Sequence, residues 1–171
     1  ELAISNITRS GSAIFFVIAN SFAVTTGSLV SNAIGARARN ELFPICHKVL
    51  KLGYAVGIPF VGLALLCNHW IVNFYTDSEL LVELAFAPFV VMLLNYTFAL
   101  PGYVYLNAVG GTGKTKITFL FQVTTTCVYL VYLYWLSFCI KASLSLYLTA
   151  EYLFVILLAL QSIIHLKSKH Y

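Results

Sequence analysis

Four long stretches of this sequence contain no charged side chain, and they constrain the fold more than any other feature. They are residues 10–36, 52–76, 84–113 and 117–140. Each is longer than the roughly 20 residues that an α-helix needs to cross the hydrocarbon core of a bilayer. A fifth stretch, residues 143–166, is interrupted by Glu151 alone.

The composition fits a chain that is buried in lipid. Charged residues make up 9% of the 171 residues and hydrophobic residues 60%, whereas roughly 25% of an ordinary soluble domain is charged. We therefore predict an all-α, polytopic membrane protein whose short connections leave no room for a separate soluble domain. The five transmembrane helices are expected at about residues 3–35, 42–75, 79–111, 115–140 and 143–166.

The basic residues are distributed unequally between the two sides of such a bundle. Eight of the ten fall on one side: Arg37, Arg39, Lys48, Lys51, Lys114, Lys116, Lys167 and Lys169. Because Lys and Arg are enriched in cytoplasmic segments, we expect this side of the bundle to face the cytoplasm and the C-terminus to be cytoplasmic. The expected location is the bacterial cytoplasmic membrane, as a multi-pass protein. The net charge of +4 follows from this asymmetry and requires no nucleic-acid partner.

Residues 108–115, AVGGTGKT, come within one residue of the phosphate-binding loop GxxxxGK(S/T). That loop needs a glycine five residues before Gly113, and this position is Ala108. A nucleotide-binding fold also needs a buried parallel sheet, which the short hydrophilic stretches cannot supply. We expect Gly110, Gly111 and Gly113 to form a tight turn between two helices instead, with no ATP bound.

No cofactor or metal site is predicted. The cysteines are spread along the chain without a CxxC pair, and most fall within or against apolar stretches: Cys46, Cys67, Cys127 and Cys139. Buried free thiols are the expectation, because a metal or redox site needs clustered partners.

Small residues and prolines indicate how the helices pack. Small residues recur at every fourth position of the first two helices, which allows close approach of helix backbones in lipid. They are Ala23, Gly27, Ser31 and Gly35, followed by Gly53 and Gly57. The third helix contains Pro88 and the pair Pro101-Gly102. These prolines predict kinks with a purely structural role or, alternatively, a hinge or unwound segment that lines a cavity.

Three segments carry a resemblance to a known family: ELAISNITRS at 1–10, GSLVSNAIGARARNE at 27–41 and NAVGGTGKTKITF at 107–119. In this order and spacing they resemble the C-terminal half of the multidrug and toxic compound extrusion (MATE) transporters. The resemblance covers the whole chain. Relatives read GTGNT where this chain has GTGKT, so Lys114 replaces a neutral residue.

The resemblance implies twelve helices in two six-helix lobes around a central cavity that opens alternately to each side. This chain, which does not begin with Met, would be a fragment that supplies the eighth to twelfth helices, most of the C-terminal lobe. Its partners would be the N-terminal lobe and seventh helix of the same protein, together with membrane lipids. The resemblance further implies an antiporter, not an enzyme, that exports drugs or other amphipathic organic compounds in exchange for sodium ions or protons.

Uncharged polar side chains are candidates for the substrate or ion path, since polar groups inside a membrane are costly unless they are paired or used. The leading candidates are Asn20, Asn95, Asn107 and Gln122. An amide can coordinate sodium or bind a drug but cannot carry a proton, so a coupling carboxylate would lie on the seventh helix or in the N-terminal lobe. Further candidates for the cavity wall are Thr25, Thr26, Thr124, Thr125, Thr126, Tyr96, Tyr103 and Tyr129. The alternative for each is a hydrogen bond to its own or a neighbouring helix.

Glu151 is the remaining candidate for the path. Counted from residue 143, it lies roughly 12 Å along its helix at 1.5 Å per residue. This depth favours a structural role at the outer interface, under which Glu151→Gln would retain most export, over a role in ion or substrate passage. Arg9, at the outer end of the first helix, is expected to extend to the interface rather than pair with an outer carboxylate.

Two other functional classes remain open. A lipid-linked precursor flippase has a similar architecture by resemblance, but it would need more basic residues in its cavity to hold a pyrophosphate. A non-transporting membrane scaffold subunit would need only the small residues at the helix contacts. The polar side chains within the predicted spans favour transport.

Overall fold

The structure is a computed structural model that describes residues 2–73, 79–140 and 144–168. Among these residues, five helices are long and apolar enough to cross a membrane. These spans are Thr8–Gly35, Arg39–Leu66, Val82–Gly111, Thr115–Phe138 and Ser145–Ser168. The described part contains helices and turns but no strand. The prediction of an all-α, polytopic membrane protein is therefore confirmed.

The elements follow the order of the apolar stretches. The long helices are α1 (Leu2–Gly35), α2 (Leu42–Leu66), α4 (Glu79–Gly111), α5 (Thr115–Trp135) and α7 (Ala150–Ser168). The shorter elements are the 3-10 turn η1 (Arg39–Glu41), α3 (Asn68–Asn73), the π-helical segment η2 (Leu136–Ile140) and α6 (Leu144–Leu148).

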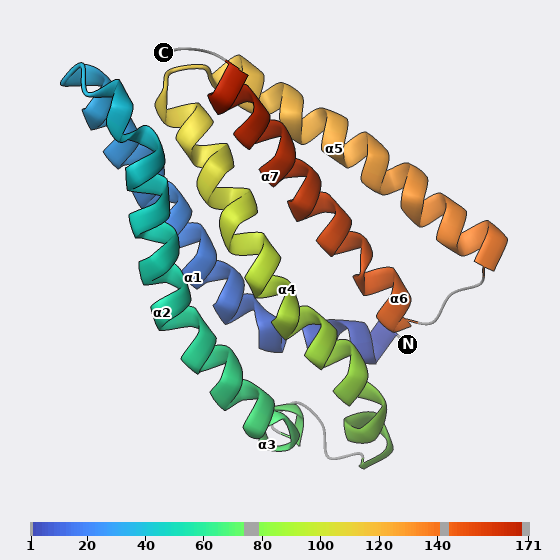
Figure 1. Ribbon diagram of the computed structural model, residues 1–171. Helices are drawn as coiled ribbons and strands as arrows, with labels where there is room; N and C mark the ends of the chain where they lie inside the picture. The colour runs from blue at the N-terminus through green and yellow to red at the C-terminus, as the bar shows by residue number, and fades with distance from the viewer. Residues whose placement is uncertain (1, 74–78, 141–143, 169–171) are drawn as a thin grey trace.

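Helix α4 occupies the centre of the bundle and packs against α1, α2 and α7, whereas α5 lies mainly against α7 (Figure 1). The α1–α2 connection, the α4–α5 connection and the C-terminal end of α7 lie at the same end of the bundle. We call this the basic end, because it carries Arg37, Arg39, Lys114, Lys116 and Lys167. Helices α1, α4 and α7 therefore run toward the basic end, and α2 and α5 run away from it.

Two of the predicted helices are divided in the structure. The predicted helix at 42–75 is interrupted at Cys67, where the side-chain amide of Asn68 donates a hydrogen bond to the carbonyl oxygen of Leu65. The predicted helix at 143–166 is interrupted at Thr149, whose hydroxyl donates to the Leu146 carbonyl oxygen at 2.6 Å. In both places a polar side chain binds the backbone near the point where the helix stops.

Glycines set the closest contacts of α4 with α1 and α2. A Cβ atom on Gly53 would lie 2.7 Å from Leu100, and one on Gly57 would collide with Tyr96. Gly27 meets the backbone of Asn107, whereas Ser31 is exposed and Gly35 has nothing within 4 Å. The predicted close contact at small residues is therefore confirmed for Gly53 and Gly57 of α2 and for Gly27 of α1, but it is wrong for Ser31 and Gly35.

The predicted glycine turn is shorter than expected. Gly110 and Gly111 belong to the last turn of α4, and only Gly113 adopts a positive φ, of 84°. A Cβ atom on Gly111 would collide with the carbonyl oxygen of Gly27. Gly111 thus serves the contact between α1 and α4, and the turn itself depends on Gly113.

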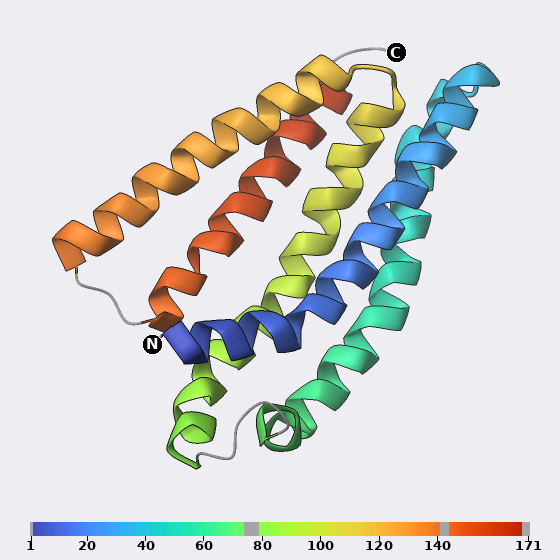
Figure 2. The ribbon, with the colours of Figure 1, turned by 180° about the vertical axis from the view of Figure 1, so that it is seen from behind.

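Helix α1 is bent near its N-terminus, where its dark blue part runs at an angle to the remainder (Figure 2). This part contains the neighbours Gly11 and Ser12, a pair of residue types found at helix kinks. The Ser12 hydroxyl donates to the Arg9 carbonyl oxygen at 3.2 Å, and Gly11 packs against the ring of Phe89 on α4. The bend therefore belongs to the part of α1 that carries Arg9.

Helix α4, in contrast, is continuous through Pro88 and Pro101. The alternative of a locally unwound segment at these prolines is therefore wrong. Gly102 is buried, and a Cβ atom there would lie 2.7 Å from the carbonyl oxygen of Val155. This glycine allows the backbones of α4 and α7 to approach closely.

Candidate functional site

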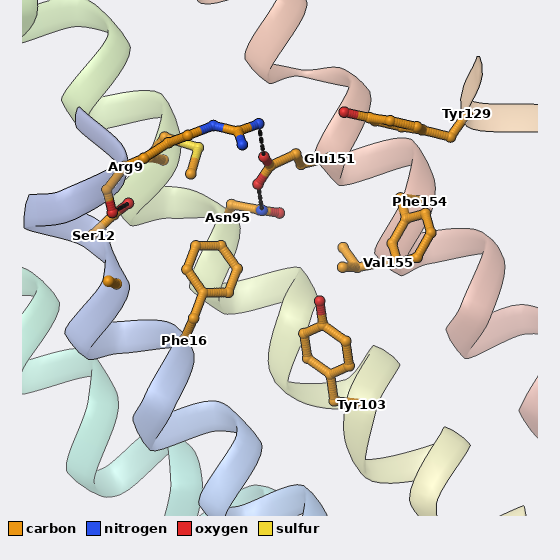
Figure 3. A pocket seen from close by; sticks show the side chains of 11 residues that line it. Arg9, Ser12, Phe16, Asn95, Tyr103, Tyr129, Glu151, Phe154 and Val155 are labelled. Carbon is orange, nitrogen blue, oxygen red and sulfur yellow. Dashed lines mark hydrogen bonds and ion pairs between the residues drawn. The ribbon is translucent and has the colours of Figure 1, made fainter. Parts of the chain in front are cut away.

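A cavity of about 540 Å³ lies between α1, α4 and α7, and Tyr129 of α5 completes its wall (Figure 3). Most of its lining is apolar. The polar lining side chains, apart from two tyrosines, are Arg9, Ser12, Asn95 and Glu151. The aromatic ones are Phe16, Tyr103, Tyr129 and Phe154, and the remaining ones are Ala13, Met92 and Val155.

The polar side chains of this cavity form a chain of contacts centred on Glu151. One guanidinium nitrogen of Arg9 lies 3.2 Å from Oε1 of Glu151 and forms an ion pair with it. Nδ2 of Asn95 donates a weaker hydrogen bond to Oε2 at 3.4 Å. Three helices that are distant in sequence thus meet at one carboxylate, as the dashed lines in Figure 3 show.

Asn95 retains an unused acceptor at this site. Its side chain is fully buried, with 0% of its surface exposed, and its Oδ1 atom has no hydrogen-bond partner. A buried amide oxygen without a partner carries a desolvation cost of about 1–3 kcal/mol. Oδ1 is therefore an unsatisfied acceptor beside the Glu151 carboxylate, with less than 1 Å² of its surface accessible.

The contact with Asn95 gives a second measure of where the Glu151 carboxylate lies along the bundle. Asn95 lies near the middle of the span Val82–Gly111, roughly 20 Å along the helix from Val82 at 1.5 Å per residue. Because Oε2 lies within hydrogen-bond distance of Asn95, the carboxylate is level with this part of the bundle. Glu151 is also in the first turn of α7, where the helix dipole favours negative charge.

Aromatic rings cover the wall of the cavity beyond the polar chain. Tyr129 and Phe154 are in edge contact, with ring centroids 5.9 Å apart. Figure 3 shows the Tyr103 hydroxyl directed into the cavity toward Asn95 and Glu151. Phe16 projects from the opposite side, on α1. The cavity thus combines an apolar, aromatic surface with one ion pair.

The other predicted path residues lie elsewhere. Asn107 lines a second cavity of about 540 Å³ at the basic end, between α1, α4 and the start of α5. Asn20 and Gln122 are exposed and line neither cavity. The structure therefore brings together two of the five leading candidates, Asn95 and Glu151.

Several further candidates make the structural hydrogen bonds that were the alternative for them. Thr25 and Thr26 donate to carbonyl oxygens one helical turn earlier in α1. The Tyr96 hydroxyl donates to the Gly53 carbonyl oxygen at 2.8 Å and so joins α4 to α2. Thr125 donates to Oε1 of Gln161 at 3.4 Å, which joins α5 to α7.

The three cysteines whose side chains the structure describes are free thiols. Cys46 is buried, but Cys67 and Cys127 are exposed free thiols, so the expectation of buried thiols is wrong for these two. The side chain of Cys139 lies outside the described part. Within that part, no group of three or more His, Cys, Asp or Glu residues is arranged to hold a metal ion.

The partner of Glu151 differs from the sequence-based expectation. Arg9 was expected to extend alone to the membrane interface, whereas the structure pairs it with Glu151 across 142 positions of sequence. A usable signal was present, because opposite charges within apolar spans are expected to pair with one another. Phe16, Met92 and Phe154 carried no such signal, since aromatic and apolar side chains are common throughout these helices.

Comparison with known proteins finds a match to one family model. The sequence model of the MatE family matches residues 1–136, which include α1 to α5. No curated protein and no solved structure matches the chain at a significant level.

Proposed function

The chain belongs to the MatE family of polytopic membrane transporters, and we propose that it forms part of a cation-coupled antiporter. The intact protein would export drugs or other amphipathic organic compounds in exchange for sodium ions or protons. A membrane potential supplies about 2.3 kcal/mol per elementary charge per 100 mV, so export needs no nucleotide. We further propose that the membrane is the bacterial cytoplasmic membrane and that the basic end faces the cytoplasm.

One observation carries this proposal: a carboxylate and a fully buried amide meet inside an apolar cavity between three spanning helices. An ionisable side chain within a membrane is costly and marks an ion or substrate pathway by default. The Glu151 carboxylate can bind sodium or take up a proton, and Oδ1 of Asn95 offers a second oxygen ligand. This arrangement favours ion passage over the interfacial structural role that residue counting suggested for Glu151.

The remainder of the cavity suits the organic substrate. A volume of about 540 Å³ lies within the range of roughly 300–1,000 Å³ that is typical of small-molecule sites. Aromatic rings such as Tyr129 and Phe154 offer apolar contact without a fixed direction, and this suits compounds of varied shape. Substrate and coupling cation would therefore occupy neighbouring parts of one cavity.

The two alternative functions receive less support. Arg9 does place a basic group in the cavity, as a flippase for a lipid pyrophosphate would require. Its charge is balanced by Glu151, however, and the cavity lining contains no second basic residue among those the structure describes. A scaffold subunit would gain nothing from a half-buried carboxylate in an apolar cavity, whose desolvation costs stability.

The test is the substitution Glu151→Gln in the full-length protein. Membrane vesicles with an imposed sodium or proton gradient would be loaded with a fluorescent amphipathic compound, and export would be followed as the gradient is varied. We expect export to fall by roughly tenfold or more, equivalent to losing about 1.4 kcal/mol of cation binding. Glu41→Gln, an exposed carboxylate at the basic end, is the matched control. Normal gradient-driven export by the Glu151 variant would refute the assignment.

A further inference from the structure

Arg9 occupies the position that a cation would take at Glu151. Its guanidinium lies 3.2 Å from Oε1, while Asn95 binds Oε2. A sodium ion or proton arriving at this carboxylate therefore meets a positive charge that is already present. Two cations cannot both be held closely by one carboxylate without repulsion.

The two partners of the ion pair differ in their freedom to move. The side chain of Glu151 is 21% exposed and lies within the cavity, whereas that of Arg9 is 58% exposed. A long arginine side chain can keep its stem on an apolar surface while its head group moves to water or to lipid head groups. Arg9 can therefore leave the carboxylate, while Glu151 and the buried Asn95 remain in place.

From this geometry we propose that Arg9 is a tethered competitor of the transported cation. It neutralises Glu151 when the site holds no cation, and it withdraws when sodium or a proton binds. This inference rests on the proposed function, because it requires that the coupling cation binds at Glu151. It assigns Arg9 a positioning and affinity-setting role, on the bent part of α1.

Such a competitor would matter most for the return step of an antiporter. An unpaired carboxylate in an apolar cavity carries a large desolvation cost, and one hydrogen bond from Asn95 offsets only part of it. Pairing with Arg9 stabilises the empty site and thus allows the transporter to reset without a bound cation. The same pairing must weaken cation binding, because the arriving cation has to displace the guanidinium.

The experiment measures cation affinity separately from maximal rate. Full-length protein in proteoliposomes would be assayed for export of a fluorescent amphipathic compound while sodium and proton concentrations are varied independently. For Arg9→Gln we expect the half-maximal cation concentration to fall by roughly twofold to fivefold, the usual worth of a partly exposed ion pair. The maximal rate should also fall, because the empty site is no longer neutralised. Arg39→Gln, in η1 beyond the opposite end of α1, is the control and should leave both quantities unchanged.

A second variant keeps the test decisive if Arg9→Gln does not accumulate in the membrane. Arg9→Lys retains the charge but replaces the planar guanidinium with an ammonium group, so a smaller fall in the half-maximal concentration is expected. An unchanged or raised half-maximal concentration in the Arg9 variants would overturn the proposal. A purely structural role for Arg9 would lower protein level and maximal rate without tightening cation binding.

Glu151→Gln separates this inference from the function on which it rests. If that variant keeps its cation dependence, the coupling cation does not bind at Glu151, and the proposed function of this site fails together with the competitor. If it loses export while Arg9→Gln has the cation affinity of the wild type, only the competitor is refuted. If both proposals hold, Arg9→Gln combined with Glu151→Gln should behave like Glu151→Gln alone.

Discussion

Gly102 of α4 and Val155 of α7 lie so close together that a Cβ atom on Gly102 would be 2.7 Å from the Val155 carbonyl oxygen. The neighbouring atom belongs to the backbone, so it cannot move aside by a change of rotamer. Val155 also lines the cavity that contains Glu151. The separation of two cavity walls therefore depends on the absence of a side chain at position 102.

Gly102→Ala should force α4 and α7 apart. We expect a loss of about 1–3 kcal/mol in stability, as for other overpacked sites, together with reduced export. Gly62→Ala is the matched control, because Gly62 lies in α2 with nothing within 4 Å of an added Cβ atom. That control should be neutral or stabilising by up to about 1 kcal/mol through helix propensity. Thermal unfolding of the purified full-length protein would measure both, and equal melting temperatures for the two variants would contradict the argument.

Asn95→Leu should separate transport from stability. The substitution removes the hydrogen bond to Glu151 and also removes a buried oxygen that has no partner. Because an unsatisfied buried acceptor is costly, we expect the melting temperature to be unchanged or raised while gradient-driven export falls. A variant that unfolds more readily and exports normally would show that Asn95 serves packing alone.

Lys114→Ala should leave gradient-driven export intact, and Mg-ATP photolabelling should be absent from both the variant and the wild type. A phosphate loop needs free backbone N–H groups, but here those of Thr112 and Gly113 donate to the carbonyl oxygens of Ala108 and Gly110. Gly110 and Gly111 are themselves helical. Specific, Mg-dependent labelling that disappears in the variant would contradict this interpretation.

Labelling of single cysteines should test the orientation of the bundle. In a Cys-free background, cysteines at Ala38 and Thr112 lie at the basic end and should react with an impermeant thiol reagent only after the membrane is opened. A cysteine at Ser78, which is outside the described residues, should react from outside the cell. The reverse pattern would show that the basic end faces outward.

The spanning helices could be predicted from the sequence because each depends on a local property, the length of an uncharged stretch. The interruptions at Cys67 and Thr149 could not be predicted in this way, since each accompanies a single side-chain hydrogen bond that hydropathy does not register. The roles of Gly110 and Gly111 were misread for a related reason. Glycine is compatible both with a turn and with close helix packing, and only the position of α1 decides between them.

The candidate site was only partly visible in the sequence. Asn95 and Glu151 stood out because polar groups are rare in these spans, but their contact depends on how α4 and α7 are placed side by side. Counting residues along its own helix puts Glu151 near one end of a span, whereas Asn95, which contacts it, lies near the middle of the α4 span. Asn20 and Gln122 are equally polar, yet they are exposed on other faces.

Helices α1 and α4 cross most closely at Gly27 and Gly111, far from the end of α1 that carries Arg9. Arg9 lies roughly 27 Å along α1 from this crossing at 1.5 Å per residue, or somewhat less because of the bend. If α1 rotated as a rigid helix by about 10° about this crossing, its backbone at Arg9 would move by about 5 Å. A movement of this size away from α7 would lengthen the 3.2 Å contact between Arg9 and Glu151 beyond ion-pair distance wherever the arginine side chain does not follow. A rotation of α1 at the basic end would in this way reach the ion pair at the other end of the helix.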